Sequence, residues 1–299
     1  MSYCTHKDKE MKRNLHLLVI DPQNDFCDLP ADYLPPPAGA NAAPTPALPV
    51  PGAHADMLRV ADLIRRGGDG LAAISITLDS HHRFDVAHSS FWMDAAQGAI
   101  GPFTQITAAD VRQGKYLPRK ASALARVLAY LDALEAAGRY TLMAWPVHCE
   151  IGSWGHNVHA DVRAAYNAWE DSALGMVGKI GKGSNPWTEH YSAVQAEVPD
   201  ADDDSTQVNQ AFLDLLRGSD QVYIAGEAGS HCVRATTEHI VANWDPRQLS
   251  QLVLLTDCMS PVTGFGAQYD DFVRDMRARG LGIAQAADIV PELLANARR

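Results

Sequence analysis

The sequence predicts an α/β fold of three layers, in which helices cover both faces of a mainly parallel sheet of about six strands. Two patterns along the 299 residues support this prediction. Short runs of almost continuous apolar residues alternate with longer amphipathic stretches. Strands and helices in alternation build a parallel sheet, because each crossover helix packs back onto one of its faces.

The expected strands and helices follow from these runs in chain order. Strands buried on both faces are apolar throughout, and five runs fit this description: 15–21, 71–78, 140–147, 221–227 and 251–257. Amphipathic stretches with helical spacing lie between or after them, at 54–66, 122–138, 206–218, 232–244 and 267–280.

We expect a polar segment at 1–14 and a single domain at 15–299 that carries long insertions. The insertions fall at about 29–56, 90–118 and 150–178. The first is dense in proline and alanine, which rules out a regular helix or strand there. Because it leaves the tip of the first strand, it is either a surface loop or a cover over a site at that end of the sheet.

Composition excludes several classes of protein. A net charge of −11 argues against nucleic acid or an anionic membrane surface as the main partner. No apolar run approaches the length of a membrane span, and the first residues lack the apolar core of a signal peptide, so we expect a cytoplasmic protein. The cysteines are odd in number and widely spaced, which indicates free thiols: Cys4, Cys27, Cys149, Cys232 and Cys258.

Chemically active side chains follow the expected strands, where the ligands of such sheets bind. Asp79 and His81 stand two residues apart, so in extended chain they point the same way and can share a metal ion. His148, after the next run, offers a third ligand. His82 and His88 compete for the same role. Carboxylate and imidazole ligands suit zinc, iron or manganese.

Cys232 lies between an expected strand and the start of an expected helix, in the stretch "GEAGSHCVRAT". The partial positive charge of a helix N-terminus lowers the pKa of a thiol and favours the nucleophilic thiolate. Asp21, at the end of the first strand, is the candidate acid–base partner. Lys182 is either a solvated surface lysine or a charge held near the thiol.

Five motifs taken in order resemble the nicotinamidases of the isochorismatase-like cysteine hydrolases. They are "VIDPQNDF", "TLDSHH", "WPVHC", "KGSNPWTEHYSA" and "GEAGSHCVRAT". The resemblance spans about 15–260. It implies a catalytic triad of Asp21, Lys182 and Cys232, which would hydrolyse nicotinamide or a related small carboxamide through a thioester.

The resemblance also implies a divalent metal at Asp79, His81 and His148, which is zinc by preference, with manganese, iron or magnesium as alternatives. It further implies a homodimer or larger homo-oligomer that acts on a small-molecule amide.

An oxyanion hole is implied around a cis bond between Glu227 and Ala228, next to Cys232, and a substrate pocket is expected at Phe26 and Trp145. The chain departs from the family at Glu227, where an apolar residue is usual, and at an extra helical stretch over 158–174. With the proline-rich insertion, this stretch suggests a reshaped pocket mouth. Two alternatives stay open: an amidase for another amide or an N-carbamoyl compound, and a catalytically silent metal-binding protein.

Overall fold

The structure is a computed structural model that describes residues 11–39 and 42–299. Of the five cysteines, Cys4 lies outside the described residues, and so does most of the expected polar segment. The other four cysteines are buried free thiols.

A six-stranded sheet with the order β10-β9-β8-β1-β2-β7 forms the centre of the molecule. All of its neighbouring strands run parallel. The predicted fold class is therefore confirmed. The strands are β1 (Leu15–Ile20), β2 (Ala73–Asp79), β7 (Gly178–Lys182), β8 (Gln221–Gly226), β9 (Leu252–Leu255) and β10 (Gly282–Ala284).

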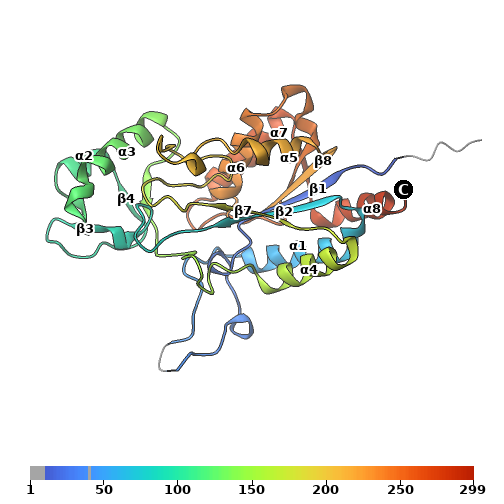
Figure 1. Cartoon of the computed structure of the whole chain (residues 1–299), viewed down its shortest axis with the longest axis horizontal. Helices are drawn as coiled ribbons and strands as arrows, with labels where there is room; N and C mark the ends of the chain where they lie inside the picture. Colours follow the sequence, from blue (N-terminus) through green and yellow to red (C-terminus); the bar gives the residue numbers. More distant parts are fainter. Residues whose placement is uncertain (1–10, 40–41) are drawn as a thin grey trace, which may run out of the picture.

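Helices cover both faces of this sheet (Figure 1). One face carries α1 (Ala53–Gly67), α4 (Ala160–Ala173) and α8 (Ala286–Ala297), and the other carries α5 (Gln210–Arg217), α6 (Cys232–Ala242) and α7 (Gly266–Arg279). The stretch expected to reshape the pocket mouth is α4, which packs against α1 in the helical layer.

A second group of elements lies at one end of the sheet, on the left of Figure 1. Here β3 (Trp92–Asp94) pairs with β5 (Tyr116–Pro118), and β4 (Thr104–Ile106) pairs with β6 (Leu142–Ala144), both antiparallel. With α2 (Ala108–Arg112) and α3 (Leu124–Ala137), they enclose a separate hydrophobic cluster. The insertion expected at 90–118 supplies most of this group.

The prediction was wrong about the run at 140–147. Only Leu142–Ala144 forms a strand, β6, and it lies outside the central sheet because β4 of the insertion pairs with it. The strand that pairs with β2 at the edge of the sheet is instead β7, which contains glycine and lysine. Neither β7, β10 nor α8 was predicted.

Short 3₁₀ helices complete the described chain: η1 (Asn24–Phe26), η2 (Ala31–Tyr33), η3 (Gly68–Gly70), η4 (Ser89–Phe91), η5 (Ala121–Ala123), η6 (Asp204–Thr206) and η7 (Pro246–Gln251). None of the helices in 11–39 and 42–299 has the length and apolar character that a membrane span requires.

One buried histidine makes the stability of the sheet depend on pH. His16 of β1 lies between Ser75 and Ser219, with its Nε2 2.9 Å from Ser75 Oγ and its Nδ1 3.3 Å from Ser219 Oγ. Burial disfavours the charged ring and lowers the pKa of His16 from 6.5 to about 4. The unfolded chain therefore binds a proton here before the folded protein does. This contribution to stability is complete above pH 6.5 and is lost as the pH falls toward 4.

Between pH 7 and pH 5, protonation of His16 in the unfolded chain should lower the free energy of unfolding of the wild type by about 2 kcal/mol. We predict that His16→Gln, whose side chain does not titrate, lacks this part of the fall. Urea unfolding at the two pH values measures it. The matched control is His82→Gln at an exposed position, which should keep the wild-type dependence. A wild-type dependence in His16→Gln would contradict the assignment.

Candidate active site

Four neighbouring strands bring the predicted catalytic triad and one predicted metal ligand together at the carboxyl edge of the sheet. Asp21 follows β1, Asp79 ends β2, Lys182 ends β7, and Cys232 begins α6 after β8. The strand order reverses between β1 and β8. The strand that follows β1 in the chain, β2, lies beside β1 on one side, and the strand that follows β8, β9, lies beside β8 on the other side. Open parallel sheets bind their ligands at this kind of switch point.

Lys182 lies at the centre of this group. Its Nζ is 2.9 Å from Asp21 Oδ2, 2.9 Å from Asp79 Oδ1 and 3.6 Å from Cys232 Sγ. Burial opposes the ammonium form, but the two carboxylates outweigh it and hold the pKa of Lys182 well above its usual range. The lysine is therefore a buried cation in contact with the thiol, not a surface residue.

Asp21 is fixed by a sharp turn at the end of β1. Its backbone is left-handed, with φ at +44°, which is uncommon outside glycine. The Thr77 hydroxyl donates to Asp21 Oδ1 at 2.5 Å, and the Asp21 N–H donates to Thr77 Oγ1 at 3.0 Å. Burial raises the pKa of Asp21 despite the opposing charge of Lys182. Its carboxyl group can thus exchange a proton with a neighbour.

The Cys232 thiol differs from the expectation. Burial is the largest influence on its pKa, and with Asp21 and Asp79 it outweighs Lys182, so the pKa of Cys232 is well above its usual range. The helix N-terminus was expected to lower the pKa of Cys232, and this prediction was wrong. A thiol that is protonated at rest needs a base at the moment of attack. Asp21 is the candidate, because its Oδ2 lies 2.9 Å from the same Lys182 Nζ that contacts the sulfur.

The turn at 226–231, hereafter the 226–231 turn, leads from β8 to Cys232. Gly226 has φ at +119°, and a side chain there would come within 2.0 Å of the Ile20 carbonyl oxygen, so only glycine fits. The bond between Glu227 and Ala228 is cis, the geometry expected at this position. Among the described residues, the backbone N–H groups of Ala228 and Cys232 have no acceptor, so they are available to a ligand.

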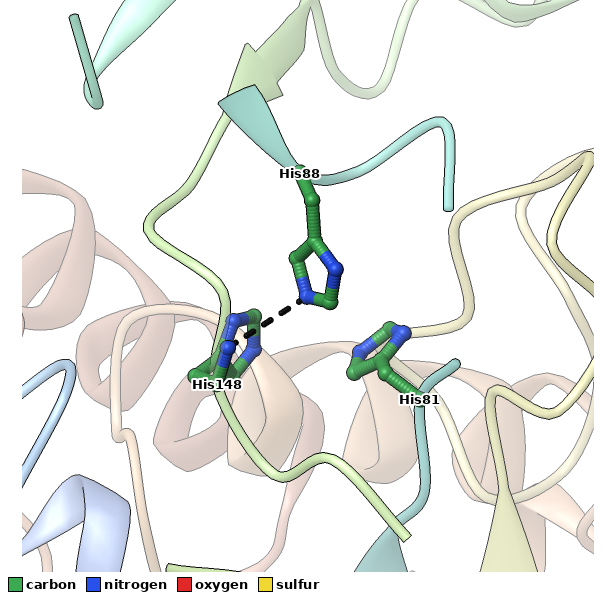
Figure 2. Close-up of side chains that lie close together, drawn as sticks. All are labelled: His81, His88 and His148. Atoms are coloured by element: carbon green, nitrogen blue, oxygen red, sulfur yellow. Dashed lines mark hydrogen bonds between the residues drawn. The ribbon is translucent and has the colours of Figure 1, made fainter. Parts of the chain in front are cut away.

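Three histidines converge beside this group, as Figure 2 shows. The ligand atoms of His81, His88 and His148 all lie within 4.8 Å of one another. Asp79 Oδ2 is 3.0 Å from His81 Nε2 and 3.3 Å from His148 Nε2. The predicted residues are thus together, and His88, weighed only as a competitor, joins them. His82 is exposed.

The surroundings of these side chains suit a divalent cation. His81 Nδ1 is 2.9 Å from Asp85 Oδ2 and His148 Nδ1 is 2.9 Å from the Pro146 carbonyl oxygen, so both Nε2 atoms face Asp79. Such outer contacts orient metal-binding imidazoles. The buried His88 Nδ1 lacks a hydrogen-bond partner in the described chain. Nitrogen and carboxylate donors in this number fit zinc, iron or manganese.

His148 follows β6, which is not part of the central sheet. Backbone hydrogen bonds to the segment after β2 hold His148 at the site instead. The His81 N–H donates to the Cys149 carbonyl at 3.0 Å, and the Trp145 N–H donates to the Ala87 carbonyl at 2.7 Å. The Asp25 carboxylate accepts from the Cys149 N–H at 2.6 Å and from the Ala47 N–H at 3.0 Å. Asp25 therefore holds both the histidine loop and the proline-rich insertion.

A narrow, mostly apolar pocket opens onto Cys232. Both predicted pocket residues line it, and Leu48 brings a wall from the proline-rich insertion. Its lining comprises Phe26, Leu48, Asp79, Trp145, His148, Glu189, Tyr191, Ala228, His231, Cys232 and Val262. Leu48 was not predicted as a pocket residue, although the insertion leaves the tip of β1 and was considered as a cover.

Comparisons with known proteins bear on the fold. No protein-family model and no curated protein sequence matches the chain. Solved structures do match. A nicotinamidase/pyrazinamidase from Acinetobacter baumanii aligns with a TM-score of 0.57 at 19% identity, over 93% of this chain and 98% of its own.

Two further solved structures agree with it. The yeast nicotinamidase, bound to the inhibitor nicotinaldehyde, has a TM-score of 0.59 at 18% identity, over 91% of this chain and 99% of its own. The pyrazinamidase of Pyrococcus horikoshii, solved with zinc, has a TM-score of 0.51 at 19% identity, over 91% and 99%. The chain has the nicotinamidase fold. At these identities the likeness concerns the fold and not the reaction.

We predict that Asp79→Ala and His148→Ala each lower the metal content of the purified protein about tenfold or more. Elemental analysis after dialysis measures it. The exposed His82→Ala is the matched control and should keep the wild-type content. Unchanged metal in both active-site variants would place the ion elsewhere.

Proposed function

We propose that the protein is a cysteine-dependent, metal-assisted amidohydrolase that cleaves nicotinamide or a related small carboxamide to the acid and ammonia. One observation carries the proposal: the Lys182 ammonium lies 2.9 Å from a carboxylate oxygen of both Asp21 and Asp79 and 3.6 Å from the Cys232 sulfur. A nucleophile that lines a pocket, with a base and an orienting cation behind it, supplies the parts that acyl transfer requires.

In the first half-reaction the Cys232 sulfur attacks the carboxamide carbon while Asp21 takes the thiol proton. The carbonyl oxygen gains negative charge, and the N–H groups of Ala228 and Cys232 are available to receive it. The carbon–nitrogen bond then breaks, Asp21 returns the proton to the nitrogen, and ammonia leaves a thioester on Cys232.

In the second half-reaction water replaces ammonia. Asp21, now ionised, accepts a proton from a water molecule that attacks the thioester carbon, and the carbon–sulfur bond breaks. The acid leaves, and the proton returns from Asp21 to the Cys232 sulfur. Lys182 keeps its charge throughout because two carboxylates surround it.

Asp79, His81, His88 and His148 would hold the divalent ion. When bound, the ion would offer a coordination position to a ring nitrogen of the substrate or to water. Asp79 links this position to the catalytic group, because its Oδ1 contacts Lys182 and its Oδ2 faces the histidines.

The pocket supports a small aromatic amide. Phe26 lies edge-on to His148, with ring centroids 5.5 Å apart, and Trp145 lies edge-on to His231 at 5.2 Å. Flat apolar walls of this kind suit a single ring. The other candidate substrates, different amides and N-carbamoyl compounds, belong to the same chemistry. A cytoplasmic homo-oligomer stays a prediction.

We predict that the metal-loaded protein releases ammonia from nicotinamide and that Cys232→Ala lowers the rate at least about 1000-fold. A coupled ammonia assay measures it, with Cys258→Ala, a second buried thiol, as the matched control that should keep near-wild-type turnover.

The other outcomes are also decisive. Release from other amides but not from nicotinamide would replace the substrate and keep the reaction. Bound metal without hydrolysis of any amide would favour the catalytically silent metal-binding protein, and full activity in Cys232→Ala would end the proposal.

A further inference from the structure

Glu227 is a buried acid at a position where the resemblance leads us to expect an apolar residue. Its side chain is 0% exposed, and it lies in the 226–231 turn, five residues before Cys232. Its neighbour is Asp56 of α1, which is 2% exposed, and Ser260 contacts both carboxyl groups. The reaction proposed above uses neither group.

Two carboxyl groups can share a hydrogen bond only if one of them keeps its proton. Asp56 has acceptor contacts at both oxygens: the Arg59 guanidinium at Oδ1, and the Ser260 hydroxyl at Oδ2 with a distance of 2.6 Å. Glu227 Oε2 accepts from the Ser260 N–H at 3.2 Å, and Glu227 Oε1 has no donor among the described residues. Glu227 Oε1, the carboxyl oxygen of the pair that has no donor in the described chain, is therefore where we expect a shared proton to lie.

The surroundings keep the proton in place. The groups that interact electrostatically with the pair are Asp28, Cys27, Cys258 and Tyr269, and Asp257 lies beside Cys258 and Tyr269. Arg59, on α1, is engaged by Asp56. Burial, followed by the charge of Asp56, holds the pKa of Glu227 well above its usual range.

The pair is connected to the reacting part of the turn through Ser260. Its N–H and hydroxyl bind Glu227 and Asp56, and its carbonyl accepts from the Gly229 N–H at 2.8 Å. Gly229 packs closely against Tyr269, because a Cβ atom there would lie 2.7 Å from the Tyr269 ring. The Val262 N–H donates to Ser230 Oγ at 3.0 Å, and Val262 lines the pocket. The pair thus joins the turn, α1 and one pocket wall.

We propose that Glu227 and Asp56 share one proton and act as positioning residues that hold the 226–231 turn, with its N–H groups, in place for the reaction of Cys232. The positioning role rests on the proposed amidohydrolase function. The N–H groups of such a turn bind charge that develops only in the transition state, so a displaced turn lowers kcat and leaves KM nearly unchanged.

Two substitutions at Glu227 distinguish the effect of its hydrogen-bond donor from the effect of its bulk. Glu227→Gln keeps a neutral donor toward Asp56 and should keep near-wild-type kcat. Glu227→Leu leaves Asp56 without this donor and should lower kcat about tenfold or more at unchanged KM. Melting temperatures of all variants show whether each assay is made on folded protein. If Glu227→Leu does not fold, Ser260→Ala, which removes one hydroxyl of the connection, takes its place with the same expected effect on kcat.

Infrared spectroscopy tests the shared proton without any substrate. The difference spectrum between wild type and Glu227→Gln at neutral pH should contain the carbonyl band of a protonated carboxylic acid. A carboxylate band in its place would overturn the shared proton, and unchanged kcat in Glu227→Leu would overturn the positioning role. If no amide is hydrolysed, the positioning role fails with the proposed function, and the band still decides where the proton lies.

Discussion

The candidate site depends on one buried cation. Lys182 is removed from water at the carboxyl edge of the sheet, and an unpaired ammonium there would be very costly. Asp21 and Asp79 offset this cost, each at 2.9 Å. Because Asp79 also faces the histidines through its second oxygen, the ammonium couples the thiol side of the site to the metal side. A change at any one of these charges is expected to disturb both.

The general fold could be predicted from the sequence because buried parallel strands are mostly apolar. β1, β2, β8 and β9 are of this kind. β7 was missed because its sequence, "GKIGK", belongs to a sheet edge and carries two lysines and two glycines. The run at 140–147 has the composition of a central strand, yet β4 pairs with its middle, and composition does not determine with which strand it pairs.

The site was predictable where chemistry depends on local spacing, and unpredictable where it depends on contacts between distant segments. Asp79 and His81 follow one strand, so their sharing of a site was foreseeable. His88 reaches the same place only because the segment after β2 pairs with the segment around Trp145. The raised pKa of Cys232 and the proton on Glu227 both arise from burial, which spacing along the chain does not reveal.

Trapping the covalent intermediate would test most directly whether Cys232 is the nucleophile. Protein quenched in acid during turnover of a slow aromatic amide is digested, and the peptide masses are measured. We expect the acyl group on the peptide that contains Cys232, and none in Asp21→Asn, which lacks the base. Ammonia release without any acylated peptide, or an acyl group on another cysteine, would contradict this expectation.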